Sequence, residues 1–166
     1  MAVLVAYASM HGSTREVAES IASTVSGRGR EAVAKPVDDA DPAGYEAVVL
    51  GSAIYFGSWL EPAYRFAEQH HAVLAERPVW LFSVGPLGTE VDDAEEQPHD
   101  IDEVREAVGA RDHRTFYGVL RRDALGFKER MMVKAVRAPE GDFRNWDEIR
   151  SWAESIADSL GTTAAP

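Results

Sequence analysis

Residues 3–20 read VLVAYASMHGSTREVAES and carry the clearest secondary-structure pattern of the chain. Residues 3–8 are continuously apolar, which predicts a strand buried on both faces of a sheet. Apolar residues then recur at helical spacing, so we expect a helix over residues 14–27, with Ser13 and Glu16 spaced as a capping box. The apolar positions of this helix are Val17, Ile21 and Val25. A strand that runs through a short polar turn into a helix is typical of parallel α/β sheets.

Apolar runs alternate with helical patterns along the rest of the chain, so the predicted class is α/β with helices on both faces of a parallel sheet. We expect five strands: Val3–Ala8, Glu31–Val37, Ala47–Ala53, Val79–Val84 and Thr115–Leu120. We expect further helices over residues 62–76, 101–108 and 146–160, the last of them behind an Asn145 cap, and an amphipathic one over residues 126–137. The strongly acidic stretch 89–103 is predicted to be an exposed loop that runs into the helix over residues 101–108.

Composition narrows the possible functions. At 166 residues we expect one domain over residues 1–160 and a frayed tail over residues 161–166. The chain has no cysteine, which excludes disulfides, thiolate zinc sites and iron–sulfur clusters, and the histidines show no spacing that indicates a metal. A net charge of -11 argues against nucleic acid as a partner. With no signal peptide and no membrane-spanning run, we expect a cytoplasmic protein.

The turn after the first strand is the sharpest chemical signal. Its residues are Ser9, Met10, His11, Gly12, Ser13 and Thr14. Hydroxyls, a flexible glycine and the N–H groups of a helix N-terminus together suit a phosphate. The patterns GxxxxGK[ST] and GxGxxG are absent, so the turn fits one phosphate monoester held by neutral donors. Two alternatives remain open: Ser13 merely caps the helix, and His11 is merely exposed.

The S-x-x-G-x-T arrangement after an N-terminal strand resembles the phosphate loop of flavodoxins, which bind flavin mononucleotide (FMN). The resemblance implies a flavodoxin-like, doubly wound, five-stranded sheet of order 2-1-3-4-5, with the cofactor at the switch point of the strand order. It also implies two more cofactor loops, after the third and fourth strands. Their candidate residues are Ala53, Ile54, Tyr55, Phe56 and Gly57 in one loop, and Ser83, Val84, Gly85, Pro86, Leu87 and Gly88 in the other.

Aromatic side chains of the first of these loops have two interpretations. Tyr55, Phe56 and Trp59 can stack on the flavin ring, and we expect one or two of them to do so. Packing at the junction of a loop and a helix is the alternative for each. In the second loop, backbone amides are expected to bond the edge of the ring.

Residues 118–136, followed by Asp142, Arg144 and Trp146, resemble the menaquinone-dependent protoporphyrinogen dehydrogenase branch of flavodoxin-domain proteins. That resemblance implies an FMN-dependent oxidoreductase that dehydrogenates protoporphyrinogen or a related substrate and passes electrons to a quinone. No catalytic acid or base is required. In this interpretation Arg121 and Arg122 lie on the substrate side, and the basic segment 121–137 contacts propionates or a membrane surface.

Two other interpretations stay open. The basic segment 121–137 can be an ordinary amphipathic helix. The acidic stretch 89–103 would repel a propionate-bearing substrate, and it favours a flavodoxin-type electron carrier that has no substrate of its own. A regulatory or quinone-reducing flavodoxin-domain protein would share the same FMN site.

Overall fold

The structure is a computed structural model that describes residues 2–9, 12–55, 58–85, 101–120, 141–142 and 144–163. Its parallel strands lie in the order β2-β1-β3-β5-β6. Their bounds are β1 (Val3–Ala8), β2 (Ala32–Pro36), β3 (Ala47–Tyr55), β5 (Val79–Gly85) and β6 (Asp112–Tyr117). Counted along the chain, this is the predicted order 2-1-3-4-5, which is confirmed. The described residues also form short strands outside this order: β4 (Ser58–Trp59) pairs with β3, and β7 (Val119–Leu120) pairs with β8 (Gly141–Asp142). The predicted strand Thr115–Leu120 therefore does not continue to its predicted end, because β6 stops at Tyr117 and residues 119–120 pair with β8 instead.

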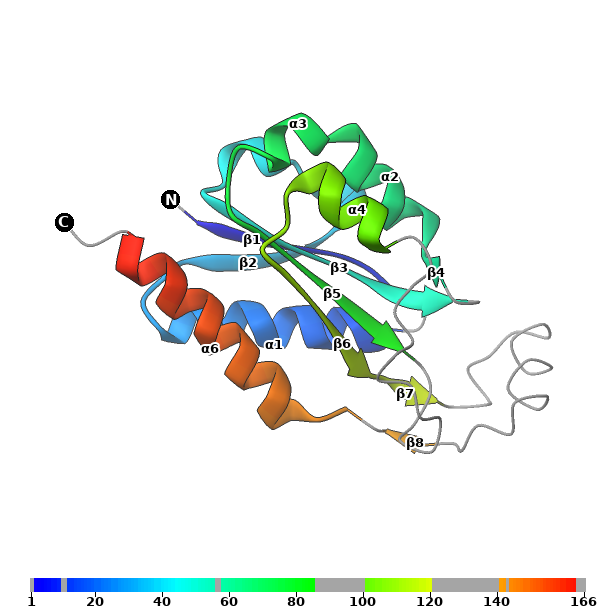
Figure 1. Ribbon diagram of the computed structural model, residues 1–166. Helices are drawn as coiled ribbons and strands as arrows, with labels where there is room; N and C mark the ends of the chain where they lie inside the picture. Colours follow the sequence, from blue (N-terminus) through cyan, green and yellow to red (C-terminus); the bar gives the residue numbers. More distant parts are fainter. Residues whose placement is uncertain are drawn as a thin grey trace.

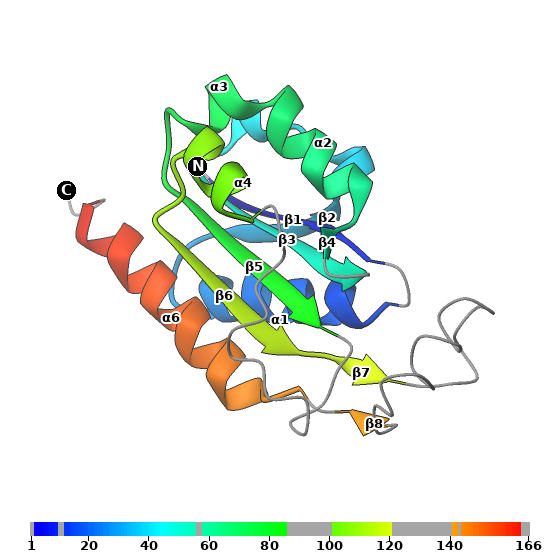
Figure 2. The same cartoon turned by 45° about the vertical axis from the view of Figure 1, so that its right-hand side comes forward.

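Helices cover both faces of the sheet (Figure 1). One face carries α1 (Ser13–Gly27) and α6 (Trp146–Thr163). The other carries α2 (Glu61–Gln69), α3 (His71–Leu74) and α4 (Ile101–Val108), and the 3₁₀ turns η1 (Val37–Asp39) and η2 (Pro42–Gly44) follow β2. The arrowheads of the main strands point to one end of the sheet, and both chain termini lie towards the other end (Figure 2). The connections that follow the strands therefore gather at one edge, the carboxyl edge.

Several predicted boundaries need correction. β6 begins at Asp112, three residues before the predicted Thr115, because the polar stretch 112–114 pairs with residues 80–82 of β5. The predicted helix over residues 62–76 is interrupted at His70, which separates α2 from α3. α6 continues to Thr163, past the predicted end at residue 160. The predicted helix over residues 126–137 and most of the acidic stretch 89–103 lie outside the described residues.

The two predicted helix caps have different outcomes. Asn145 caps α6, where its Oδ1 accepts the Glu148 N–H at 3.1 Å, so this prediction is confirmed. The capping box of Ser13 and Glu16 is wrong, since Ser13 is already helical and Gly12 is the N-cap residue. Gly12 has a φ of 89°, a left-handed conformation that glycine adopts without a steric penalty.

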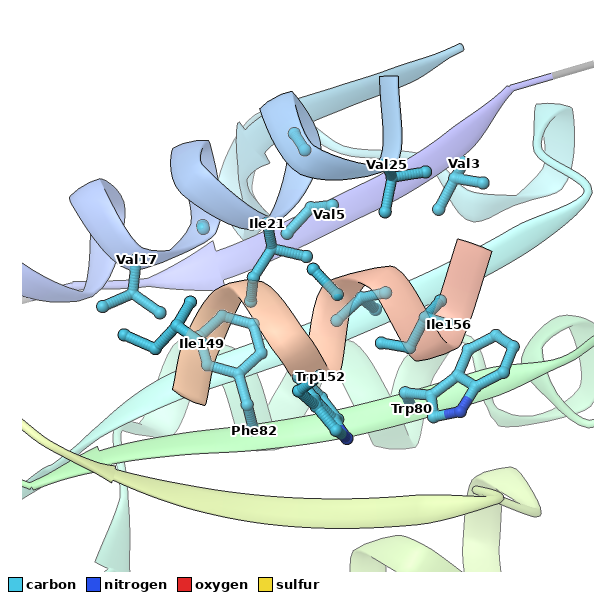
Figure 3. Close-up of a cluster of buried hydrophobic side chains, with 14 of the residues drawn as sticks. Val3, Val5, Val17, Ile21, Val25, Trp80, Phe82, Ile149, Trp152 and Ile156 are labelled. Carbon is cyan, nitrogen blue, oxygen red and sulfur yellow. The ribbon is translucent and has the colours of Figure 1, made fainter. Parts of the chain in front are cut away.

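The core between the sheet and the pair α1 and α6 is built around the Phe82 ring (Figure 3). Phe82 is fully buried, and its ring centre lies 6.5 Å from that of Phe116 and 6.3 Å from that of Trp152. Its partner in the neighbouring strand is Gly51, and a Cβ added to Gly51 would collide with the Phe82 ring. Gly51 in β3 thus makes room for the largest fully buried side chain of this core.

The opposite core, beneath α2, α3 and α4, is mainly aliphatic. Its fully buried members include Leu4, Leu50, Leu74 and Leu81. Val79 and Leu81 of β5 belong to this core, whereas the alternate residues Trp80, Phe82 and Val84 belong to the core beside α1 and α6. This alternation follows from the pleat of a strand. Within the described helices, none is long and apolar enough to cross a bilayer.

Replacing Gly51 with alanine tests the packing of Phe82. We expect G51A to lower the free energy of unfolding by about 1–3 kcal/mol, because the new methyl group overpacks the core. Chemical denaturation followed by circular dichroism measures the loss. G27A is the matched control, since a Cβ at Gly27 meets nothing within 4 Å and alanine is the better helix residue there. Equal stability of G51A and the wild type would contradict the packing described for Phe82.

Candidate functional site

Two hydrogen bonds of Gly12 join the end of β1 to the start of α1. Gly12 donates its N–H to Ser9 Oγ at 3.0 Å, and the Glu16 N–H bonds Gly12 O at 3.2 Å. The first turn of any helix leaves N–H groups without an intrahelical acceptor. In the described part of the turn, no side chain caps α1. The helix therefore presents uncapped donors and the positive end of its dipole at the carboxyl edge.

Thr14 gives this helix end an unsatisfied hydroxyl. The side chain is fully buried, and its Oγ1 has no hydrogen-bond partner within the described residues. Burying a hydroxyl without a partner costs about 1–3 kcal/mol. Side chains of a helix lean towards its N-terminus, so a hydroxyl in the first turn lies beside the uncapped N–H groups. A ligand that accepts hydrogen bonds would satisfy both.

A cavity of about 310 Å³ adjoins this turn. It is bounded by the end of β1, the end of β2 with the following turn, and the start of α2. The residues that line it are Tyr7, Ala8, Ser9, Gly12, Arg15, Pro36, Val37, Asp38, Leu60 and Pro62. Burial raises the pKa of the Tyr7 phenol, against the charge of nearby Arg15, so Tyr7 stays a neutral hydrogen-bond donor. The cavity offers donors and apolar walls next to the helix end.

Strand register brings the predicted loops to the same edge. Ala8, Ser52, Ser83 and Thr115 form one row across β1, β3, β5 and β6. Beyond that row, a Cβ placed on Gly85 would lie 3.8 Å from Ile54 Cδ1, so the ends of β3 and β5 are in contact range. The segments predicted to surround one ligand therefore start side by side, although they are far apart in the sequence.

The segment after β3 is a hairpin, whereas the prediction was a loop beginning near residue 53. Ala53, Ile54 and Tyr55 belong to β3, where all three are half-buried, and Tyr55 pairs with Ser58 of β4. Trp59 is 5% exposed and packs in the core beneath α2. Of the two interpretations of this ring, the structure therefore favours packing over stacking on the flavin. Tyr55 is half-buried at the end of β3, at the carboxyl edge.

Ser83 lies beneath the edge. Its Oγ is 2.7 Å from Trp59 Nε1 and 2.7 Å from His113 Nε2, and all three side chains are buried. Val84 is also buried, and Gly85 is half-buried. Of residues 83–85, the described part of this segment, the Ser83 and Val84 side chains are therefore buried, and the prediction that the turn bonds the flavin ring through its amides stays a prediction.

Some predicted site residues lie outside the described residues: Met10, His11, Phe56, Gly57, Pro86, Leu87, Gly88, Arg121 and Arg122. Ser9, Gly12, Ser13 and Thr14 are brought together at the helix end. In the described ranges, no group of three or more His, Asp or Glu side chains is placed to hold a metal ion.

Four residues that contribute to this edge were not predicted. Arg15 and Asp38 line the cavity. Gly118 lets β6 approach β5, since a Cβ there would collide with Gly85 O. His113 is buried in a polar stretch that lies outside the predicted strand Thr115–Leu120. The pattern that could have indicated His113 and Ser83 is a polar residue at a position of a strand that faces the core.

A comparison with protein-family models shows which family the chain belongs to. The family model described as "Flavodoxin domain" matches residues 4–147, a range that begins in β1 and ends at the start of α6. The chain belongs to the flavodoxin domain family. No curated protein sequence matches it. Family membership implies FMN as the cofactor, and the described residues of this flavodoxin domain fit the phosphate of FMN through the unsatisfied Thr14 hydroxyl and the uncapped end of α1.

Solved structures agree on the fold of this flavodoxin domain. A flavodoxin from the domain Archaea is 17% identical with a TM-score of 0.65, over 96% of this chain and 99% of that one. Flavodoxin 2 from Bacillus cereus is 21% identical with a TM-score of 0.61, over 98% and 99%. The rubredoxin oxygen:oxidoreductase of Desulfovibrio gigas is 15% identical with a TM-score of 0.67, over 98% of this chain but 37% of its own.

The variant T14V tests the phosphate site of this flavodoxin domain. Valine keeps the shape and removes a hydroxyl that has no partner, so we expect the stability of the apoprotein to be unchanged or higher. We expect FMN affinity to fall roughly tenfold to hundredfold. This range corresponds to the loss of about 1.5–3 kcal/mol, the contribution of a hydrogen bond to a charged group. Quenching of FMN fluorescence measures the affinity.

T24V is the matched control for T14V, because Thr24 lies in the same helix and its hydroxyl only bonds Ser20 O. It should bind FMN like the wild type. A T14V variant with unchanged FMN affinity would exclude Thr14 from the phosphate site.

Burial of His113 makes stability depend on pH. Desolvation, aided by Arg105, lowers the pKa of His113 to about 4, while Asp112 and Asp102 oppose the shift. The unfolded chain takes up this proton near pH 6.5, so stability falls as the pH drops from about 6.5 towards 4. We expect the wild type to lose roughly 2 kcal/mol relative to H113Q between pH 7.5 and 4.5.

Urea denaturation of both proteins at the two pH values measures this difference. H71Q, at an exposed position, is the control and should follow the wild type. If the difference between the wild type and H113Q does not change with pH, His113 is not buried as a neutral group.

Proposed function

We propose that this flavodoxin domain is an electron carrier that docks on basic redox partners. The observation that carries the proposal is the charge of the carboxyl edge. Asp38 and Asp39 follow β2, Asp102 and Glu103 lie in the first turn of α4, and all four side chains are exposed. The net charge of -11 has the same sign. An acidic surface around a cofactor steers a basic partner towards it and fixes the orientation of the encounter.

The described residues support binding and orientation more than substrate chemistry. FMN, when bound, supplies the electron transfer. Ser9, Thr14 and the N–H groups of α1 would hold its phosphate, while Tyr55 and the backbone at Gly85 lie where the ring would extend. A carrier needs its cofactor held at the edge of the protein, and this arrangement meets that need without an acid or a base.

A dehydrogenase is the second candidate, favoured by the sequence of the segment 121–137. Its basic and apolar residues resemble those of the menaquinone-dependent protoporphyrinogen dehydrogenase branch. In this alternative Arg121 and Arg122 meet the propionates of a porphyrinogen or an anionic membrane surface, and the electrons pass from FMN to a quinone. The segment lies outside the described residues, so the proposal rests on its sequence.

The carrier proposal predicts a charge-dependent rate. In D39K/D102K we expect electron transfer to a basic c-type cytochrome to slow by about tenfold at low salt, because steering is lost, and to approach the wild-type rate as salt increases. Stopped-flow absorbance of the reduced protein mixed with the cytochrome measures it. E31K/E76K is the control with the same change in charge, since both residues are exposed and precede β2 and β5 at the opposite end of the sheet. Equal slowing in both variants would contradict docking at the carboxyl edge.

Turnover separates the two candidates. We expect no oxidation of protoporphyrinogen with a menaquinone analogue as acceptor, under conditions where the FMN-loaded protein reduces the cytochrome. Turnover in the wild type that is lost in R121E/R122E with FMN retained would replace the carrier proposal by the dehydrogenase. Absorbance of the porphyrin product is the readout.

A further inference from the structure

Two buried hydroxyls lie side by side beneath the β3–β4 hairpin. Ser52 and Ser83 are register partners in β3 and β5, and both are 0% exposed. Ser52 Oγ accepts the Leu60 N–H at 2.9 Å and donates to Ala53 O at 2.8 Å. Ser83 Oγ accepts the Trp59 Nε1–H at 2.7 Å. The two contacts are made by Trp59, at the end of β4, and by Leu60, the N-cap residue of α2.

His113 completes the second of these contacts. The indole N–H of Trp59 can only donate, so the Ser83 oxygen is its acceptor. The Ser83 hydroxyl still has a proton to donate, and among the contacts of this oxygen His113 Nε2, 2.7 Å away, is the group that can accept it, so we assign Ser83 as the donor in this bond. This direction requires a neutral imidazole with its own proton on Nδ1. The result is one ordered series of hydrogen bonds from β4 through β5 to β6.

The surroundings keep His113 in the neutral form. α4 places Arg105 and Asp102 towards it, and Asp112 is its neighbour in β6, while β4 and β5 contribute Trp59 and Ser83, which do not titrate in this range. Burial and Arg105 outweigh the two carboxylates, and they lower the pKa of the imidazole to about 4. Near neutral pH, His113 is therefore available as an acceptor.

We propose that His113 and Ser83 are positioning residues that fix the β3–β4 hairpin in the orientation in which it meets FMN. The proposal rests on FMN binding at the carboxyl edge. Trp59 is anchored from below, and Tyr55, which pairs with Ser58 at the other end of the hairpin, is held where the ring would lie. Without an acceptor at position 113, the Ser83 hydroxyl can rotate, and the Trp59 indole loses its fixed partner.

Ser52 has a different effect, because its contact holds a backbone N–H and involves no titratable group. The two anchors are thus separable: Ser52 fixes where the chain enters α2, and the series through His113 fixes the rotation of the Trp59 side chain. A proton on His113 would reverse the last bond of the series, since Nε2 would become a donor to Ser83 Oγ.

The test compares FMN affinity at pH 7 in three variants at buried positions. We expect H113L to bind FMN about tenfold more weakly than the wild type, because the acceptor is lost. H113Q should restore the affinity to within about twofold, since its Oε1 can stand in place of Nε2. V108A, which removes two methyl groups from the same core beneath α4, should lower stability and leave FMN affinity unchanged.

A second readout needs no cofactor. In the apoprotein, the Nε1–H resonance of Trp59 should shift as His113 titrates towards pH 4, and the shift should be absent in H113Q. Wild-type affinity in H113L, or equal weakening in H113L and V108A, would overturn the positioning role. A wild type that binds no FMN but shows the Trp59 shift would instead overturn the FMN proposal, and the hairpin could then have no role in positioning that cofactor.

Discussion

The arrangement of this protein depends on one unsatisfied polar cluster, the uncapped N-terminus of α1 with the buried Thr14 hydroxyl. A folded chain rarely buries a hydroxyl without a partner, because the loss of hydration is not recovered. Ser13 could have capped a helix that began one residue later. Instead Gly12 takes a left-handed conformation and Ser13 is drawn into the helix, so the donors face outward from the carboxyl edge. This is the geometry that a phosphate group completes.

The sheet gives that cluster its neighbours. Parallel strands end at one edge, so the segments after β1, β3 and β5 meet there even though the chain between them crosses over both faces. The row from Ala8 to Thr115 lies close to this edge, where β1 ends, and pairing continues past it as far as Gly85 and Tyr117. Two glycines allow close contacts between neighbouring strands. Gly51 leaves room for the Phe82 ring, and Gly118 leaves room for the carbonyl oxygen of Gly85. Core packing and site geometry are therefore set by the same strands.

Local patterns predicted much of this fold. The continuous apolar run of β1 and the amphipathic stretch of α4 are confirmed at their predicted bounds, because each pattern coincides with one element. β6 was displaced by three residues because Asp112, His113 and Arg114 look like a loop when read alone. Their pairing with β5, and the bond of Trp152 Nε1 to Asp112 Oδ2, come from residues distant in the sequence.

The candidate site was also predictable only where its residues are neighbours in the sequence. The residues of the phosphate loop were found because helix donors, hydroxyls and glycine occur in one short stretch. The inward hydroxyls of Ser52 and Ser83, and the buried place of Trp59, depend on three strands meeting, which no local spacing reveals. Arg15 and Asp38 join one cavity only after β2 is placed beside β1.

The most direct test of the phosphate site is a comparison of FMN with riboflavin, which has the same ring and ribityl chain but no phosphate. Fluorescence titration of the apoprotein with each flavin gives the two dissociation constants. If the phosphate is held by α1 and Thr14, FMN binds at least about a hundredfold more tightly, equivalent to roughly 3 kcal/mol. Equal affinity for the two flavins would contradict a phosphate site at the start of α1.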